Sequence, residues 1–191
     1  AGAAAVRVRA PSTFPSDATE SAWRARIARD PADHVALVML ARVLERDGNV
    51  AGARAAMGAA LRLAPADRQT LVEAGAFHLR AGAPAQAMTH LRLVADLYPE
   101  TWASVWPAMV VVLDGGRLDD VFDGIARDNP EWWPAFIDVA CRRARDAGAL
   151  QRMAAVRATA GTASAAEQRC LIERLQRENR WPNAYQVWLN S

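Results

Sequence analysis

The stretches "DPAD" at residues 30–33 and "APAD" at 64–67 are nearly identical, and their prolines lie 34 residues apart. Pro99 follows Pro65 after another 34 residues, and Pro130 follows Pro99 after 31. Because other prolines fall outside this series, the interval is informative only if the residues between the prolines keep the same register. A regular interval of this length is typical of an array of small structural units that share one functional surface.

The residues between the prolines do keep one register. Small or apolar residues stand twelve, eight and five positions before three of these prolines: Ala53, Met57 and Ala60; Ala87, Leu91 and Val94; Leu118, Phe122 and Ile125. This spacing places them along one stripe of a helix.

A second stripe precedes each of these sets and has the i, i+3, i+4, i+7 spacing of a helix. Its members are Leu37, Leu40, Ala41 and Leu44; Leu71, Ala74, Gly75 and His78; Val105, Ala108, Met109 and Val112. Glycine lies between the two stripes, in "RDGNV" 46–50, "RAGAP" 80–84 and "DGGRL" 114–118. Each interval therefore predicts two helices joined by a turn in which glycine allows the chain to reverse.

On these residues the chain resembles a bacterial tetratricopeptide repeat (TPR) protein, a family built from 34-residue helix–turn–helix repeats. The resemblance implies an all-α fold, a right-handed α-solenoid of about five TPR-like repeats with an N-terminal helix within 18–31. It divides the chain into a flexible lead-in, the solenoid and the repeats within it: 1–16; 17–191; and about 31–64, 65–98, 99–130, 131–164 and 165–191.

Two residues depart from the repeat pattern. Pro107 lies inside the first helix of the third repeat, where a proline predicts a kink. Arg143 occupies a position of the fourth repeat at which the stripe calls for an apolar side chain.

Composition excludes several classes of partner. A little over half of the residues are apolar and alanine is abundant, which favours helices that pack closely. The formal net charge of +2 gives no field that would attract nucleic acid. No apolar run approaches the ~20 residues that span a bilayer, so we expect no membrane insertion of this segment. All 23 basic residues are arginine, as a GC-rich coding sequence would produce, and arginine suits the recognition of carboxylates.

Residues 1–16 contain two prolines and no acidic residue, which predicts a flexible lead-in. Such a segment could follow a cleaved export signal or a membrane anchor, or result from trimming of the chain. On this basis we rank a periplasmic or membrane-tethered location slightly ahead of a cytoplasmic one.

The sequence offers one motif that suggests a metal site. Asp119, Asp120 and Asp123 form a DDxxD spacing, in which carboxylates one helical turn apart can share a hard cation. A site of that kind needs a second acidic cluster, and the sequence has none, so we favour capping of a helix N-terminus. The three histidines are scattered, and no nucleophile or nucleotide motif is present. We predict no enzymatic activity, no metal and no cofactor.

In TPR proteins the first helix of each repeat lines the concave face, so the resemblance implies a peptide-binding groove there. The positions beside the core stripe include Arg42, Arg46, Gln69, Val72, Arg80, Trp106, Val110, Ile137, Arg145 and Arg169, and the last repeat adds Glu173, Gln176 and Arg177. Trp106 would be the aromatic anchor, and Arg80 and Arg145 would bind carboxylates. The alternative is that these arginines are solvated side chains on ordinary helix faces.

The tryptophans and cysteines each allow two interpretations. Trp102, Trp106, Trp132 and Trp133 crowd the starts of two consecutive repeats, where they either wedge helices in the core or form an aromatic ledge. Cys141 and Cys170 lie 29 residues apart and lack zinc-site spacing. A disulfide needs facing side chains, and we place these two on different helix faces, so we predict two unpaired thiols.

The sequence and the resemblance together predict a non-catalytic protein–protein interaction scaffold. Its partner would be a protein or peptide segment with an acidic residue or a free C-terminus, held in the concave groove. Two other classes stay open: a structural or oligomerisation module that uses its end faces or tryptophans, and a helical domain of a larger envelope or glycan-related enzyme or assembly.

Overall fold

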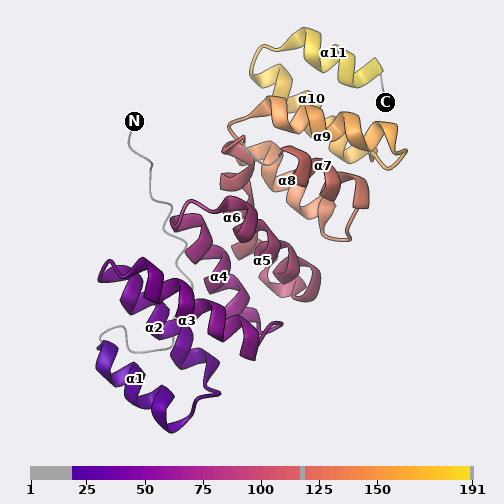
Figure 1. Cartoon of the computed structure of the whole chain (residues 1–191). Helices are drawn as coiled ribbons and strands as arrows, with labels where there is room; N and C mark the ends of the chain where they lie inside the picture. Colours follow the sequence, from indigo (N-terminus) through magenta and orange to yellow (C-terminus); the bar gives the residue numbers. More distant parts are fainter. Residues whose placement is uncertain (1–18, 117–118, 190–191) are drawn as a thin grey trace. The chain divides into compact units, whose positions relative to one another are not determined.

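The protein is helical throughout the part that the structure describes. A computed structural model describes residues 19–116 and 119–189 (Figure 1). These ranges hold α-helices, one short 3-10 helix and no strand, which confirms the all-α prediction. The helices are α1 (Glu20–Arg29), α2 (His34–Arg46), α3 (Val50–Leu63), α4 (Arg68–Arg80), α5 (Pro84–Leu97), α6 (Trp102–Asp114), α7 (Asp119–Asp128), α8 (Trp133–Arg143), α9 (Ala147–Thr159), α10 (Ala165–Arg177) and α11 (Trp181–Leu189). Within these ranges, every helix is too short or too polar to span a bilayer.

Short turns join the helices in pairs, and each repeat range expected from the sequence contains one pair. Within pairs, α2 packs on α3, α8 on α9 and α10 on α11. Between neighbouring pairs, first helices contact first helices, as α2 does with α4, α6 with α8, and α8 with α10. The predicted lead-in over 1–16 and the stripe residue Leu118 lie outside the described residues.

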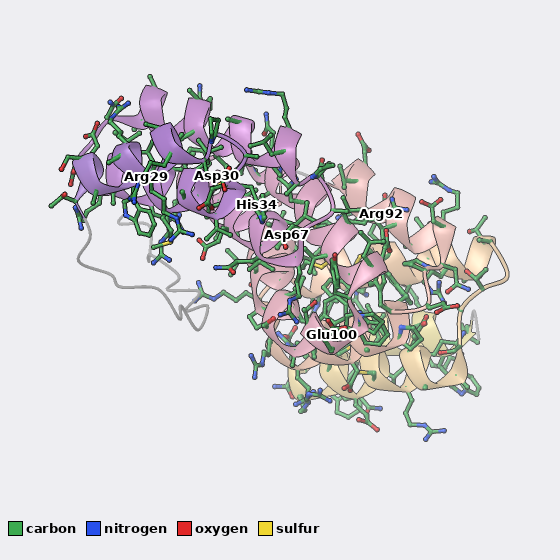
Figure 2. The ribbon with its side chains drawn as sticks, turned by 90° about the horizontal axis from the view of Figure 1, so that it is seen from below. Arg29, Asp30, His34, Asp67, Arg92 and Glu100 are labelled. Carbon is green, nitrogen blue, oxygen red and sulfur yellow. The ribbon has the colours of Figure 1, made fainter. Side chains whose placement is uncertain are left out.

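The duplicated "PAD" stretch marks the start of two first helices. Asp33 Oδ1 accepts a hydrogen bond from the Ala36 N–H at 2.8 Å, and Asp67 Oδ1 accepts one from the Thr70 N–H at 2.8 Å. An aspartate in this place satisfies an N–H group that the helix itself leaves unpaired. His34 Nε2 lies 3.7 Å from Asp67 Oδ1, so the two caps are neighbours (Figure 2).

Left-handed residues end the helices, as the glycine turns predict. Gly48 after α2 and Gly82 after α4 have φ of +82° and +69°, which glycine adopts without a steric penalty. The residue after each glycine donates its N–H back to a carbonyl inside the helix: Asn49 to Leu44 at 2.8 Å, and Ala83 to His78 at 2.8 Å. These bonds pair carbonyl groups that the helix end would otherwise leave unsatisfied.

Residue contacts divide the chain into two compact units, Ala1–Leu93 and Val94–Ser191, with the boundary inside α5. In the N-terminal unit, Trp23 on α1 is buried together with apolar residues of α2, α3 and α4. The salt bridge from Arg26 Nε to Asp33 Oδ2, 2.5 Å long, links α1 to the start of α2. The helix predicted before the first repeat therefore covers one side of this core.

Aromatic rings form the core of the C-terminal unit. Trp106, on α6, is only 3% exposed, and its ring centroid lies 5.4 Å from that of Trp132 and 5.8 Å from that of Phe136. Trp132 and Trp133 are also buried, so three of the four crowded tryptophans wedge helices and do not form a surface ledge. The helix α6 is continuous from Trp102 to Asp114, with Pro107 inside it.

A buried ion pair completes this core. Arg157, 2% exposed on α9, donates two hydrogen bonds to the carboxylate of Glu167 on α10, at 2.7 and 2.9 Å. Its other N–H groups bond to three oxygens at the ends of α7 and α9: Ala126 O, Asn129 Oδ1 and Thr162 O. The guanidinium also lies over the Trp133 ring, 5.2 Å from the centroid. All five donors of the arginine are therefore used.

The end of α8 explains why Arg143 departs from the apolar stripe. The helix ends at Arg143, whose side chain is exposed, and the C-cap residue Ala144 is buried in its place at 1% exposure. Arg174 on α10 donates hydrogen bonds to the carbonyls of Cys141 and Ala144, at 2.9 and 2.7 Å. These contacts satisfy helix-end carbonyls and fasten α10 to α8.

Candidate functional site

An open surface groove lies between α8 and α10, the first helices of the last two pairs. Its volume is about 650 Å³. Both helices contribute polar side chains to its lining: Asp138 and Arg142 from α8, and Cys170, Glu173, Gln176 and Arg177 from α10. The contact between α8 and α10, held by the two hydrogen bonds of Arg174, positions these side chains.

The groove presents both signs of charge, and its charges differ in how far they are already paired. Arg142 forms an ion pair with Asp138 one helical turn before it. Arg177 donates Nε only to the backbone carbonyl of Glu173, at 3.3 Å. The Glu173 carboxylate has no ion-pair or hydrogen-bond partner among residues 19–116 and 119–189. Arg177 and Glu173 thus offer the groups that a ligand could bind without displacing another side chain.

On α8, the turn after it and α10, more arginines than carboxylates lack an ion-pair partner within the described residues. The Arg174 and Arg157 guanidiniums are already paired with Glu178 and Glu167. Exposed arginines whose guanidinium groups have no ion-pair partner in the described part of the chain remain on α8, its C-terminal turn and α10: Arg143, Arg145, Arg169 and Arg177. The surface around the groove is therefore better suited to an anionic than to a cationic partner.

Three of the residues predicted to line a groove are instead buried in the C-terminal unit. Trp106, Val110 and Ile137 are 3%, 5% and 7% exposed. The prediction of Trp106 as an exposed anchor is therefore wrong in this structure, because the ring packs against Trp132 and Phe136. Ile137 fails for a similar reason, since that face of α8 is covered.

The two arginines predicted in the C-terminal unit are exposed but do not line the groove. Arg145 follows the end of α8, and its backbone N–H donates to Asp114 Oδ1 at 2.7 Å. Arg169 directly precedes the lining residue Cys170. Arg80 belongs to the N-terminal unit, whereas Trp106 and Arg145 belong to the C-terminal unit.

In the N-terminal unit the predicted residues lie on α2 and α4, where carboxylates of the chain already pair with the arginines. Arg80 binds Glu45 through two hydrogen bonds of 2.8 and 2.7 Å, which raise its pKa. Arg42 Nη1 lies 3.6 Å from Glu73 Oε1. A ligand carboxylate would therefore have to displace Glu45 in order to bind Arg80 as predicted.

The other three predicted residues of this unit also lie on α2 and α4. Arg46 is exposed and bonds to the adjacent Asp47 at 3.0 Å. Gln69 and Val72 are partly exposed on α4. The face is consequently a set of internal ion pairs around half-buried side chains.

Sequence reasoning missed Asp138, Arg142 and Cys170 as lining residues. The predicted face of α8 began at Ile137, one position from Asp138, and one residue rotates a helix by about 100°. The i, i+4 spacing of Asp138 and Arg142 was the available signal, because such pairs form on exposed helix faces.

Among the described residues of the DDxxD segment, the side chains do not form a metal site. Asp123 Oδ1 lies 3.5 Å from Arg152 Nε, and the Asp119 side chain lies outside the described residues. No group of three or more His, Cys, Asp or Glu residues in the described ranges is arranged to hold a metal ion. His78 and His90 stack on each other, with ring centroids 5.3 Å apart.

No protein-family model matches the chain, and no curated protein matches it in sequence. The candidate function therefore depends on the geometry of the chain itself.

Proposed function

We propose that the protein is a TPR-like, non-catalytic scaffold that binds a peptide segment of a partner protein in the groove between α8 and α10. In this proposal the helix pairs form a right-handed solenoid, and first helices line its concave face. Support comes from the repeated helix pairs and from the contacts of first helices with first helices. The observation that carries the proposal is the open groove of about 650 Å³ between two such helices.

The chemistry of the groove favours a segment with an acidic side chain or a free C-terminal carboxylate. Arg177 has unused N–H donors in a planar fork that matches the two oxygens of a carboxylate. Gln176 adds an amide that both donates and accepts, as peptide backbone recognition requires. Glu173 would select a positively charged or amide group elsewhere in the same segment.

A peptide selection tests this proposal. A library of random peptides with free C-termini is displayed against the full chain, and the enriched peptides are synthesised and labelled. Fluorescence polarisation then compares the wild type with Arg177→Glu, Gln176→Trp and Arg127→Glu. The first two variants alter the groove, and the third makes the same charge change on the exposed end of α7.

We expect acidic or free-carboxylate peptides whose affinity falls at least about tenfold in Arg177→Glu and in Gln176→Trp, because a charge-assisted hydrogen bond contributes roughly 1.5–3 kcal/mol. Arg127→Glu should bind as the wild type does. Equal affinity in all four proteins, with circular dichroism showing that each is folded, would exclude the groove as the binding site.

A second candidate function, self-association, is favoured by an exposed apolar stripe on α11. Large apolar side chains at i, i+4, i+7 and i+8 form one stripe with 58–59% exposure: Trp181, Tyr185, Trp188 and Leu189. The Tyr185 and Trp188 rings stack with centroids 5.7 Å apart. The helix has no charged side chain, so two copies could place identical faces together without charge repulsion. The occupant we propose is a second copy of this helix.

Sedimentation velocity over a range of protein concentrations tests the second candidate. Trp188→Glu should remove self-association, because a carboxylate buried in an apolar contact is costly. Gln186→Glu adds the same charge to an exposed position of α11 outside the stripe and should leave self-association unchanged. A wild type that stays monomeric at every concentration, or dimers that survive in Trp188→Glu, would contradict it.

A further inference from the structure

Cys141 and Cys170 belong to adjacent first helices, and both thiols are free. Cys141 lies on α8 and is 1% exposed, whereas Cys170 on α10 is partly exposed and lines the groove. The two side chains interact, and this interaction contributes to the raised pKa of the Cys141 thiol. The expectation that the two cysteines lie on different helix faces does not hold, because their side chains interact across the contact between α8 and α10.

The backbone around the pair is held on both sides. Arg174 lies one turn after Cys170 on α10 and donates a hydrogen bond to the Cys141 carbonyl at 2.9 Å. It donates a second to the Ala144 carbonyl at 2.7 Å. These contacts hold α10 against α8 beside both cysteines, and a disulfide requires that the backbones carrying its two cysteines lie close together.

The surroundings of the two thiols differ, which sets the order in which they react. Burial raises the pKa of the Cys141 thiol, and its contact with Cys170 raises it further. A buried, protonated thiol is inert toward oxidants in solution. Cys170 is reached from the open groove, so it is the thiol that a dissolved oxidant meets first.

We propose that Cys141 and Cys170 form a dithiol site that small-molecule disulfides oxidise to an intramolecular disulfide between α8 and α10. In the first step the Cys170 thiolate attacks one sulfur of the small disulfide, forms a mixed disulfide and releases one thiolate. Cys141 then loses its proton to solvent, and its sulfur attacks the Cys170 sulfur and expels the second small thiolate. The two protein thiols are oxidised, and one small disulfide is reduced to two thiols.

Oxidation would change the surface of the groove as well as the helix contact. The Cys170 sulfur would turn from the groove toward α8. The new bond would join α8 and α10 covalently and close a loop of the chain that contains α9. A cross-link that closes this stretch of chain restricts the unfolded state, so the oxidised form should melt at a higher temperature. The site itself does not depend on the proposed peptide binding.

Intact-mass spectrometry of the full chain tests the proposal. The reduced protein is incubated with oxidised glutathione at neutral pH, remaining thiols are blocked with N-ethylmaleimide, and the products are weighed and mapped by non-reducing digestion. The wild type should lose both reactive thiols, carry no glutathione and yield one linked peptide containing Cys141 and Cys170. Its thermal unfolding midpoint should rise by several degrees and fall again on reduction.

Two variants separate the steps. Cys141→Ala should stop at a glutathione adduct on Cys170, and Cys170→Ala should react much more slowly than the wild type, because its only thiol is buried. Circular dichroism checks that both are folded, and Cys141→Val serves in place of Cys141→Ala if the smaller side chain destabilises α8. A wild type that stops at the Cys170 adduct, that keeps both thiols, or that forms only links between chains would overturn the proposal. Each of these outcomes is independent of whether any peptide binds.

Discussion

At the scale of single residues, Arg157 shows how much one buried side chain can organise. Its five hydrogen bonds connect the ends of α7 and α9 with Glu167 on α10. Arg157→Leu would leave the Glu167 carboxylate buried without a partner, and it should lower the free energy of unfolding by about 3–5 kcal/mol. Urea denaturation measures this difference.

Arg127→Leu, an exposed arginine, is the control and should change stability little. The double variant Arg157→Leu/Glu167→Leu should be more stable than Arg157→Leu alone, because no charge is left unpaired. If Arg157→Leu unfolds at the wild-type urea concentration, the ion pair contributes no net stability.

His78 and His90 should make the protein less stable in mild acid. Burial lowers the pKa of both imidazoles below 6.5, with Arg54 adding to the effect on His78 and His78 adding to that on His90. Because the unfolded chain binds these protons more readily, their contribution to stability is complete above about pH 6.5 and is lost as the pH falls through the folded-state pKa values.

The double variant His78→Asn/His90→Asn isolates this effect, since all carboxylates remain. Thermal unfolding midpoints measured between pH 8 and pH 5 should fall less in the variant than in the wild type. Parallel curves for the two proteins would show that the stacked histidines do not titrate as proposed.

At the scale of helices and turns, the left-handed glycines define where first helices end. Gly82→Ala should destabilise the protein by about 1 kcal/mol, because a side chain at a φ of +69° is strained although no atom obstructs it. Gly58→Ala, inside α3, is the matched control and should stabilise by about 0.5–1 kcal/mol. Equal effects of the two changes in thermal unfolding would contradict the assignment of the turn.

The register of the second helices is tested at Ala87. This residue is fully buried, and its carbonyl lies 3.8 Å from where a Cβ would stand at Gly75 on α4. Ala87→Trp should therefore overpack the contact between α4 and α5 and destabilise by ~1–3 kcal/mol or more. Ala85→Trp places the same ring on the exposed side of α5 and should leave the melting temperature nearly unchanged.

At the scale of the whole molecule, the chain divides into two compact units, and we expect them to respond separately to damage. Arg157→Leu removes contacts only in the C-terminal unit. Hydrogen exchange should therefore accelerate at amides of α8, α9 and α10 and stay unchanged at amides of α2 and α3. An equal loss of protection in both units would show that the chain unfolds as one cooperative body.

The helices, their glycine turns and their caps were predictable because they depend on neighbours a few residues away. The stripes at Ala53, Met57 and Ala60, and at Ala87, Leu91 and Val94, are all buried, as their spacing predicts. The aspartates of the duplicated stretch cap α2 and α4 for the same local reason: their side chains bond to N–H groups three residues on. Local geometry of this kind is read directly from residue order.

The candidate site was only partly predictable, because it depends on which helix faces meet. The pattern placed a groove on first helices, but it could not tell that Trp106 turns inward or that Glu45 already binds Arg80. Adjacent positions on a helix differ by about 100° in direction, so an error of one residue exchanges Asp138 in the groove for Ile137 in the core. The approach of Cys141 to Cys170 likewise depends on which faces of α8 and α10 meet. Residue order therefore decided the helices and turns of this protein, whereas helix packing decided which charges were left unpaired and which thiols came together.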